Sequence, residues 1–198
     1  MTALLALAAV VGYLLGALSP ASFAAARRGV DLRGVGSGNP GAANVGRALG
    51  RRTGAVVALL DLAKGALPSA AFGALDHRAG LVAGIAAVLG HVSSPFLRGK
   101  GGKGVATAAG AILGSHPLWF PVALLTWLLG VAVTRWIALA SMLGALSTLV
   151  VALVEGHDRL WAAALTAVIV ARHRDNVVRR LAAGRGDQTA GEQGPADG

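Results

Sequence analysis

Residues 2–26 read TALLALAAVVGYLLGALSPASFAAA, a predominantly apolar stretch without a charged residue. Its length is that of a membrane-crossing helix, because about 20 apolar residues span the hydrocarbon core of a bilayer. A secretory signal peptide would carry a basic region ahead of its apolar run, which this stretch lacks, and further apolar stretches follow it. We therefore interpret residues 2–26 as a retained membrane helix.

The composition extends this interpretation to the whole chain. Of the 198 residues, 55% are apolar and 14% are charged, a mixture too apolar for an ordinary soluble domain. We predict an all-α, polytopic membrane bundle of seven transmembrane helices, with spans near 3–26, 54–75, 79–96, 105–115, 117–134, 136–154 and 159–171. Residues 1–183 are expected to form one membrane-embedded domain, and residues 184–198 a disordered polar tail.

Some of these spans are short. Residues 105–115 would reach only about 16 Å as a helix, roughly half of a ~30 Å hydrocarbon core. An alternative merges residues 105–134 into one long helix, which gives six spans and places both termini on the same side of the membrane.

The placement of basic residues favours seven spans. With an outside N-terminus, the inside segments hold 15 of the 18 lysines and arginines, whereas the outside turns hold only Arg78 and Arg159. Such asymmetry follows the positive-inside rule, and merging the two spans would send the basic C-terminal segment outward. We therefore expect the N-terminus outside and the C-terminus in the cytoplasm.

Two further features of the composition limit the chemistry. The chain has no cysteine, which excludes disulfides, zinc–thiolate sites and cysteine nucleophiles. Its formal net charge of +9 fits either cytoplasmic anchoring or an anion-binding site. The positions of the basic residues must decide between these two interpretations.

The first inner loop contains residues 36–47, GSGNPGAANVGR. Glycines let a backbone approach an anion closely, serine and asparagine add neutral donors, and arginine can bind two oxygens at once. The spacing of the glycines also matches a dinucleotide-binding fingerprint, but no strand precedes it and Asp61, at the acidic position, lies in a predicted span. The candidate phosphate-binding residues of this loop are Gly36, Ser37, Gly38, Asn39, Gly41, Asn44 and Arg47.

The second inner loop contains residues 99–107, GKGGKGVAT. It is not a Walker A motif, because Leu97 stands where the first glycine belongs and Gly104 follows the lysine. A flexible cationic turn that leads into a helix N-terminus favours an anion. Positive-inside anchoring is the alternative, but anchoring does not require four glycines among the charges. The candidate residues here are Lys100, Gly101, Gly102, Lys103 and Gly104.

The third segment, residues 172–180, reads RHRDNVVRR and begins at the inner end of the last span. A basic membrane anchor explains its arginines. It does not explain His173 and Asn176, because neither contributes charge at neutral pH.

Other polar residues lie within or between the predicted spans. Asp61 and Lys64 are one helical turn apart inside the second span, where ionisable residues are either functional or form a structural ion pair. The histidines of the outer turns, His77, His116 and His157, are expected to be interfacial or solvated.

The residues that are missing narrow the reaction. The chain offers no cysteine nucleophile, no histidine followed by aspartate at the fifth position after it, and no zinc-type His/Glu motif. The remaining mechanism is electrostatic catalysis on anions that backbone N–H, arginine and lysine groups hold and orient. We expect no metal and no cofactor.

The three motifs, GSGNPGAANVGR, GKGGKGVAT and RHRDNVVRR, resemble in order and spacing the acyl-phosphate-dependent glycerol-3-phosphate acyltransferase family of bacterial membranes. The likeness extends from about Tyr13 to Gly184. It implies a seven-span enzyme of the bacterial cytoplasmic membrane, with its N-terminus outside and its active site facing the cytoplasm. It also implies acyl transfer from acyl phosphate to the 1-hydroxyl of glycerol 3-phosphate, which gives 1-acylglycerol 3-phosphate for phospholipid synthesis.

The resemblance also implies residue roles. Ser37, Arg47, Lys103 and His173 would be catalytic. Phosphate would be bound by Ser37, Asn39, Asn44, Arg47, Lys100 and Lys103 with nearby backbone N–H groups, and glycerol 3-phosphate would be oriented by His173 and Asn176. The proton of the attacking hydroxyl would pass to His173 or to a phosphate oxygen of a substrate, of which we favour the latter. The expected partners are the two substrates and the lipid bilayer, with no nucleic acid, and a monomer is compatible with the sequence.

The chain departs from the family pattern at three places. Ala43 replaces a usual threonine, residues 92–95 replace a usual phenylalanine-containing run, and Gly186 replaces a usual acidic residue. A paralogue with altered acyltransferase activity is therefore one alternative. A transporter or channel for a phosphorylated metabolite is another, which Asp61 and Lys64 keep open.

Overall fold

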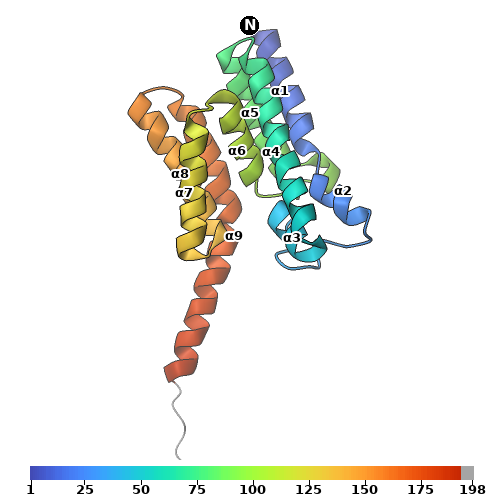
Figure 1. Ribbon diagram of the computed structural model, residues 1–198, viewed down its shortest axis with the longest axis vertical. Coiled ribbons are helices and arrows are strands. Elements are labelled where there is room, and N and C mark those ends of the chain that lie inside the picture. The colour runs from blue at the N-terminus through green and yellow to red at the C-terminus, as the bar shows by residue number, and fades with distance from the viewer. Residues whose placement is uncertain (193–198) are drawn as a thin grey trace, which may run out of the picture.

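The computed structural model describes residues 1–192, which form nine α-helices and one short 3-10 helix, with no strand in that part of the chain (Figure 1). In chain order the helices are α1 (Thr2–Ala17), α2 (Pro20–Ala26), α3 (Ala42–Leu49), α4 (Arg51–Gly73), α5 (His77–Val92), the 3-10 helix η1 (Pro95–Leu97), α6 (Val105–Ser115), α7 (Trp119–Thr134), α8 (Ile137–Glu155) and α9 (Arg159–Glu192). The prediction of an all-α fold is confirmed.

Four helical stretches within residues 1–192 are long and apolar enough to cross a membrane. They are Thr2–Ala26, Arg51–Gly73, His77–Leu97 and Ile137–Glu155, while α6 and α7 are apolar but shorter. Large apolar side chains also cover the outside of the bundle, and those of Leu59, Leu67, Leu129 and Val133 are each more than 60% exposed. Soluble monomers rarely expose so much apolar surface, so this exterior suits the hydrocarbon core of a bilayer.

The first predicted span consists of two helices rather than one. α2 begins at Pro20, which has no backbone N–H and fits the first position of a helix, and Ser19 caps it by accepting a hydrogen bond from the Ser22 N–H at 3.2 Å. The break leaves carbonyls at the end of α1 without partners inside the helix. Two polar side chains satisfy them: the Ser94 hydroxyl donates to Ala17 O and Lys64 Nζ donates to Leu18 O, each at 2.6 Å.

The helices pack closely in pairs, α1 against α5, α4 against α6, and α7 against α8. Small residues at the crossings let the backbones touch, as is typical of membrane helices. A Cβ at Gly65 of α4, for example, would overlap the carbonyl oxygen of Thr107 in α6. Val88, Ile112 and Ile169 belong to the main apolar core, which joins α5 and α6 to α9.

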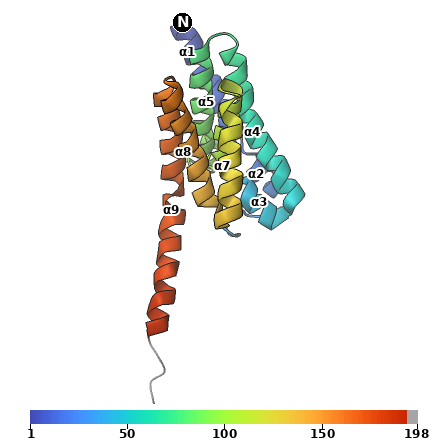
Figure 2. The ribbon, with the colours of Figure 1, turned by 60° about the vertical axis from the view of Figure 1, so that its left-hand side comes forward.

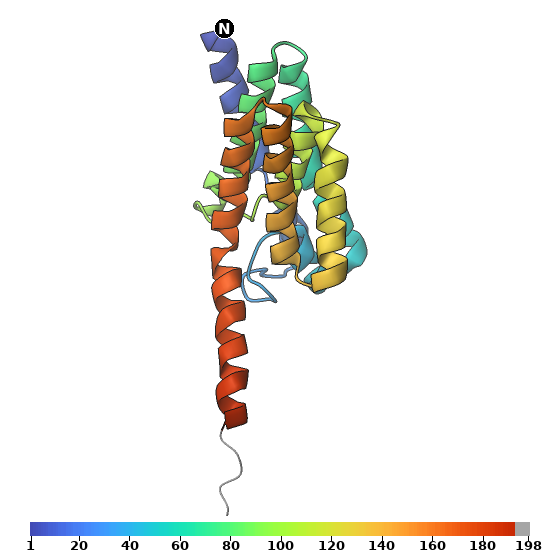
Figure 3. The ribbon, with the colours of Figure 1, turned by 90° about the vertical axis from the view of Figure 1, so that its left-hand side faces the viewer.

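The bundle has two different ends (Figure 3). The turns between α4 and α5, α6 and α7, and α8 and α9 lie at the end where the N-terminus lies, which we call the N-terminal end. The other end, which we call the α3 end, carries α3, residues 27–41 and residues 93–104. α3 itself was not expected, because the glycines of residues 36–46 indicated a loop.

α9 runs past the α3 end of the bundle in one continuous helix (Figures 1 and 2). It includes residues 184–192, which lie in the segment expected to be disordered. Extending a helix that has already formed adds one backbone hydrogen bond for each residue fixed, which explains why a polar sequence can continue it. The rest of the expected tail, residues 193–198, lies outside the described residues.

Candidate active site

The glycine-rich turn between η1 and α6 meets the middle of α9 at the α3 end. Lys103 Nζ donates a hydrogen bond to Asn176 Oδ1 at 2.6 Å. The Arg172 guanidinium donates to the carbonyl oxygens of Gly101 and Gly102 at 3.0–3.3 Å. The second and third sequence motifs therefore form one structural unit.

Lys103 lies in a strongly cationic environment. Its pKa is lowered to about 8, first by burial and then by neighbouring guanidinium groups, those of Arg179, Arg172 and Arg47. Burial disfavours the charged ammonium, and like charges disfavour it further. Because Arg47 belongs to the first motif, its influence on Lys103 shows that all three motifs contribute charge to one place. Asp175 acts in the opposite direction, but the basic groups outnumber it among the described residues, and an anion would supply further negative charge.

Asn44 holds the first loop in place through hydrogen bonds from its side chain to the loop backbone. Its side chain is buried, with Oδ1 accepting from the Ser37 N–H at 3.0 Å and Nδ2 donating to Leu32 O and Val35 O at 3.1 and 3.0 Å. A Cβ at Gly36, whose φ is +58°, would overlap Asn44 Oδ1, so the loop requires glycine there. The structure thus gives Asn44 a different role from the expected phosphate contact, because its amide is used in holding the loop.

Two other polar groups of the first motif, the Ser37 hydroxyl and the Arg47 guanidinium, differ from the Asn44 amide. Within the described residues the Ser37 hydroxyl and the Arg47 guanidinium make no hydrogen bond with the protein, and Arg47 is exposed. Ala43 is also exposed, in the first turn of α3. Ser37 and Arg47 are therefore free to contact a ligand.

The glycines of the second loop serve for close packing rather than as free donors. The N–H groups of Gly101 and Gly102 donate to Val92 O and His91 O at 3.2 and 3.1 Å. A Cβ at Gly101 would overlap the His91 carbonyl oxygen, and a Cβ at Gly102 would overlap the His91 ring. These two N–H groups were expected to bind phosphate, but the free N–H groups nearby are instead those of the first turn of α6, which Gly104 precedes with φ +83°.

The two lysines of the second loop have different surroundings. Lys103 joins Asn176, whereas Lys100 is exposed and lines a cavity of about 430 Å³ with Arg33, Phe96, Leu97 and Arg98. The cationic groups of this cavity make a second region for an anion.

A buried polar network that includes His91 lies next to the second loop. Asp61 and Lys64 form an ion pair at 2.9 Å, and His91 Nδ1 lies 3.5 Å from Asp61 Oδ1 and 3.2 Å from the Thr107 hydroxyl. Sequence reasoning singled out Asp61 and Lys64 but missed His91. The available signal was that a third ionisable residue also fell inside a predicted span near the same end. The structural ion-pair interpretation accounts for Asp61 and Lys64.

His173 is a buried imidazole with one nitrogen already used. Its Nδ1 lies 2.8 Å from Ile169 O, to which it donates, so the neutral ring presents Nε2 as an acceptor. Burial lowers the pKa of His173, and the charges of Lys103 and Arg172 lower it further, while the bond to Ile169 acts in the opposite direction. His173 is therefore neutral at neutral pH and can accept a hydrogen bond from a hydroxyl group.

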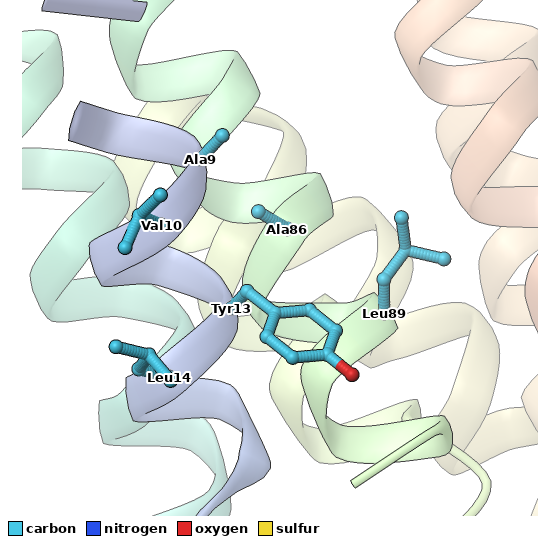
Figure 4. Close-up of a pocket in the computed structure, with 6 residues that line it drawn as sticks. All are labelled: Ala9, Val10, Tyr13, Leu14, Ala86 and Leu89. Atoms are coloured by element: carbon cyan, nitrogen blue, oxygen red, sulfur yellow. The ribbon is translucent and has the colours of Figure 1, made fainter. Parts of the chain in front are cut away.

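An apolar groove lies between α1 and α5 (Figure 4). It has a volume of about 380 Å³ and is lined by Ala9, Val10, Tyr13, Leu14, Ala86 and Leu89. Its one polar group is the Tyr13 hydroxyl, which donates to Ser93 O at 3.2 Å. Ser93 begins the segment that carries Lys100 and Lys103, so Tyr13 links the groove to that segment.

Comparisons with known proteins agree with this arrangement. The glycerol-3-phosphate acyltransferase family profile matches residues 6–184. The glycerol-3-phosphate acyltransferase of Aquifex aeolicus is 39% identical over 179 residues, covering 87% of this chain and 93% of that protein, and the one of Pseudomonas putida strain F1 is 45% identical over 186 residues, covering 90% and 96%. The crystal structure of PlsY (YgiH), an integral membrane glycerol 3-phosphate acyltransferase in its glycerol 3-phosphate form, superposes with a TM-score of 0.86 at 37% identity, covering 90% of this chain and 92% of that one. The chain therefore belongs to the glycerol-3-phosphate acyltransferase family.

Proposed function

We propose that this chain transfers an acyl group from acyl phosphate to the 1-hydroxyl of glycerol 3-phosphate. The hydroxyl oxygen attacks the acyl carbon, the bond from that carbon to the phosphate oxygen breaks, and inorganic phosphate leaves. The products are 1-acylglycerol 3-phosphate and phosphate. The reaction needs two phosphate-bearing molecules to be held side by side.

The observation that carries this proposal is the unbalanced positive charge around Lys103. Arg47, Arg172 and Arg179 lie close enough to depress its pKa, so a phosphate at this place would relieve their mutual repulsion. As the acyl–oxygen bond breaks, negative charge grows on the leaving phosphate, and cations fixed in advance stabilise that charge. The cavity beside Lys100 and Arg33 supplies a second cationic region for the other phosphate.

The attacking hydroxyl must lose its proton. We assign His173 Nε2 as an acceptor of a hydrogen bond from this hydroxyl, but the lowered pKa of His173 makes the imidazole a weak base. A phosphate monoester has its second pKa near 6 and is already present in the site. We therefore assign the proton to a substrate phosphate oxygen, and to His173 and Asn176 the orientation of glycerol 3-phosphate.

The acyl chain is assigned to the apolar groove of Figure 4. The groove is bounded by α1 and α5 and includes Tyr13, whose hydroxyl contacts Ser93 at the start of the segment that carries Lys103. An acyl chain in the groove would place its carbonyl end toward the cations.

The orientation we propose has seven spans, an outside N-terminus and an active site that faces the bacterial cytoplasm. The distribution of lysine and arginine supports it, as does the position of α3 and residues 93–104 at one end of the bundle. Because the chain has no cysteine, single cysteines can be added one at a time. An impermeant maleimide on intact cells should label Leu75→Cys at the α4–α5 turn but not Arg28→Cys after α2, and the reverse pattern would contradict the orientation.

The donor is tested with purified protein in detergent. Acyl phosphate, acyl-CoA and acyl carrier protein are each supplied with glycerol 3-phosphate, and the lysolipid is measured by mass spectrometry. We expect product with acyl phosphate alone. The double variant Arg47→Ala, Lys103→Ala should lose at least about 10²-fold in turnover, as expected when donors to a developing anion are removed. Exposed Arg51→Ala is the matched control, and normal turnover by the double variant would refute the site.

A further inference from the structure

The N-terminal end of the bundle holds a second polar cluster, formed where three turns meet. His77 is the first residue of α5, His116 follows α6, and Asp158 precedes α9. Asp158 Oδ2 lies 2.7 Å from His77 Nε2 and 2.9 Å from His116 Nε2. Sequence reasoning expected His116 to be interfacial or solvated, but it is buried and stacked on Trp119, with ring centroids 3.8 Å apart.

One carboxylate oxygen in this cluster, Asp158 Oδ2, faces more hydrogen-bond donors than it has lone-pair sites to accept them. His157 Nδ1 is a third imidazole nitrogen on Asp158 Oδ2, at 3.0 Å. A carboxylate oxygen offers about two lone-pair sites, so three N–H groups directed at Oδ2 exceed its capacity. In addition, His116 Nδ1 is buried without a partner among the described residues, so Nε2 carries the only polar contact of this ring.

A cation resolves this excess. If His77 and His116 turn lone pairs rather than N–H groups toward a metal ion, Asp158 Oδ2 needs to accept only the hydrogen bond from His157. The three ligand atoms already lie within 4.8 Å of one another. Zinc bonds of about 2.0–2.1 Å at tetrahedral angles place ligands about 3.3 Å apart, so small outward rotations of the rings would admit the ion.

The neighbouring side chains form an outer shell on the Asp158 side of the cluster. His157 contacts Asp158 with Nδ1 and Glu155 Oε2 with Nε2, the latter at 3.0 Å, and Glu155 Oε2 also accepts from Trp119 Nε1 at 2.7 Å. Such outer partners orient the first ligands and are typical of metal sites.

We propose that His77, His116 and Asp158 bind one divalent transition metal ion of the zinc class, with a fourth position open to water. Two imidazoles and one carboxylate suit such an ion, whereas calcium and magnesium prefer oxygen ligands. The ion would tie together the α4–α5, α6–α7 and α8–α9 turns, which are distant in sequence. The proposal departs from the sequence-based expectation of no metal and is independent of the reaction at the α3 end.

The test uses the untagged full chain in detergent after treatment with a chelator. Zinc is added, excess is removed, and bound metal is measured by mass spectrometry, while Co²⁺ absorption reports tetrahedral coordination. We expect one ion per chain, and melting temperature raised by roughly 5–10 °C at a zinc concentration about 100 times the Kd. Lack of saturable binding by the wild-type chain would overturn the proposal.

Three variants locate the ion. His116→Gln, Asp158→Asn and the exposed His77→Gln should each weaken zinc binding at least about 100-fold, since even outer-shell changes cost roughly 10–100-fold. His173→Gln removes a histidine from the opposite end and should leave zinc binding unchanged. Gel filtration and lysolipid synthesis verify that the three cluster variants fold. If His116→Gln does not fold, the exposed His77→Gln still tests the site. Zinc binding that survives in the variants that fold would place the ion elsewhere.

Discussion

The α3 end and the N-terminal end both gather basic side chains, but they differ in how that charge is balanced. At the α3 end, lysine and arginine side chains crowd together, and the pKa of Lys103 falls to about 8. At the N-terminal end, three histidines share Asp158. Burial alone would raise the pKa of that carboxyl, but hydrogen bonds from His77, His157 and His116 outweigh burial and lower it to about 2. The number of basic groups thus says little about a ligand, whereas their excess over carboxylates indicates an anion.

The largest effect is expected when a carboxylate is placed directly beside Lys103. Asn176→Asp changes little in size and places a negative charge 2.6 Å from Lys103 Nζ. The new ion pair should take the place of the phosphate, so we expect turnover to fall about 10²–10³-fold. Lysolipid synthesis measures the loss.

The same substitution should raise the melting temperature of the ligand-free protein, because it relieves repulsion among the cations. Asp175→Asn is the matched control at the neighbouring position and should change turnover only a few-fold. Turnover by Asn176→Asp at the wild-type rate would show that Lys103 does not bind an anion.

The second prediction concerns how firmly the cationic loop is held. In Gly101→Ala the new Cβ meets the backbone carbonyl of His91, which cannot rotate away, so the loop must shift. A misplacement of about 1 Å near reacting groups can cost about 10²-fold in rate. We expect a loss of that size in kcat, measured at saturating substrate.

Gly102→Ala should behave differently, because its new Cβ meets the His91 side chain. Adding His91→Ala to Gly102→Ala should recover part of the lost activity but should not rescue Gly101→Ala. Gly34→Ala is the control, at a glycine with a negative φ where a Cβ would make only an ordinary van der Waals contact with Asp31 O. Equal rescue of both variants would contradict the packing.

The third prediction is a pH dependence of opposite sign for activity and stability. Phosphate binding by Lys103 requires its ammonium form, so activity should fall as the pH rises through about 8, at most about tenfold per unit. Because the folded-state pKa lies below the usual 10.5, the folded protein releases this proton first. The stability of the ligand-free protein should therefore rise between about pH 8 and pH 10.5.

Turnover and melting temperature across this range measure the two effects. Lys103→Arg keeps its charge at these pH values and should lack the activity loss, whatever its absolute rate. A wild-type loss that persists in Lys103→Arg would assign the titration to another group.

The smallest expected effect concerns Ala43. This residue is exposed in the first turn of α3, so Ala43→Thr would add a hydroxyl beside the first loop. We expect the KM for a phosphorylated substrate to fall by about two- to five-fold, since one neutral hydrogen bond at an exposed position contributes about 0.5–1 kcal/mol. Ala55→Thr, at an exposed position near the start of α4, is the control. A KM that does not change would mean that the threonine position does not contact substrate.

The sequence predicted the helices well because apolar periodicity and length are local properties. The break at Ser19–Pro20 could have been predicted as well, since serine before proline is a helix-start signal. α3 was missed because glycines dominate the segment around it. The role of Asn44 required knowledge of a folded loop, because its partners Leu32, Val35 and Ser37 are identified only by their positions in space.

The two polar clusters show the limit of sequence reasoning more clearly. Lys103 and Asn176 are 73 residues apart, yet each lies in a motif whose composition indicated a site. His77, His116 and Asp158 lie in three ordinary turns, and only the helix packing brings them together. Residues that form no local pattern cannot be grouped before the topology is known.

The hydrogen bonds that hold the glycine-rich loop of residues 99–104 determine when the conformational entropy of this loop is lost. Hydrogen bonds within the protein, to Val92, His91 and Arg172, fix Gly101 and Gly102. The entropy lost in ordering this loop is therefore lost once, when the chain folds, and not again in each catalytic cycle. A loop rich in glycine, the most flexible of residues, thereby becomes a rigid element of the folded enzyme.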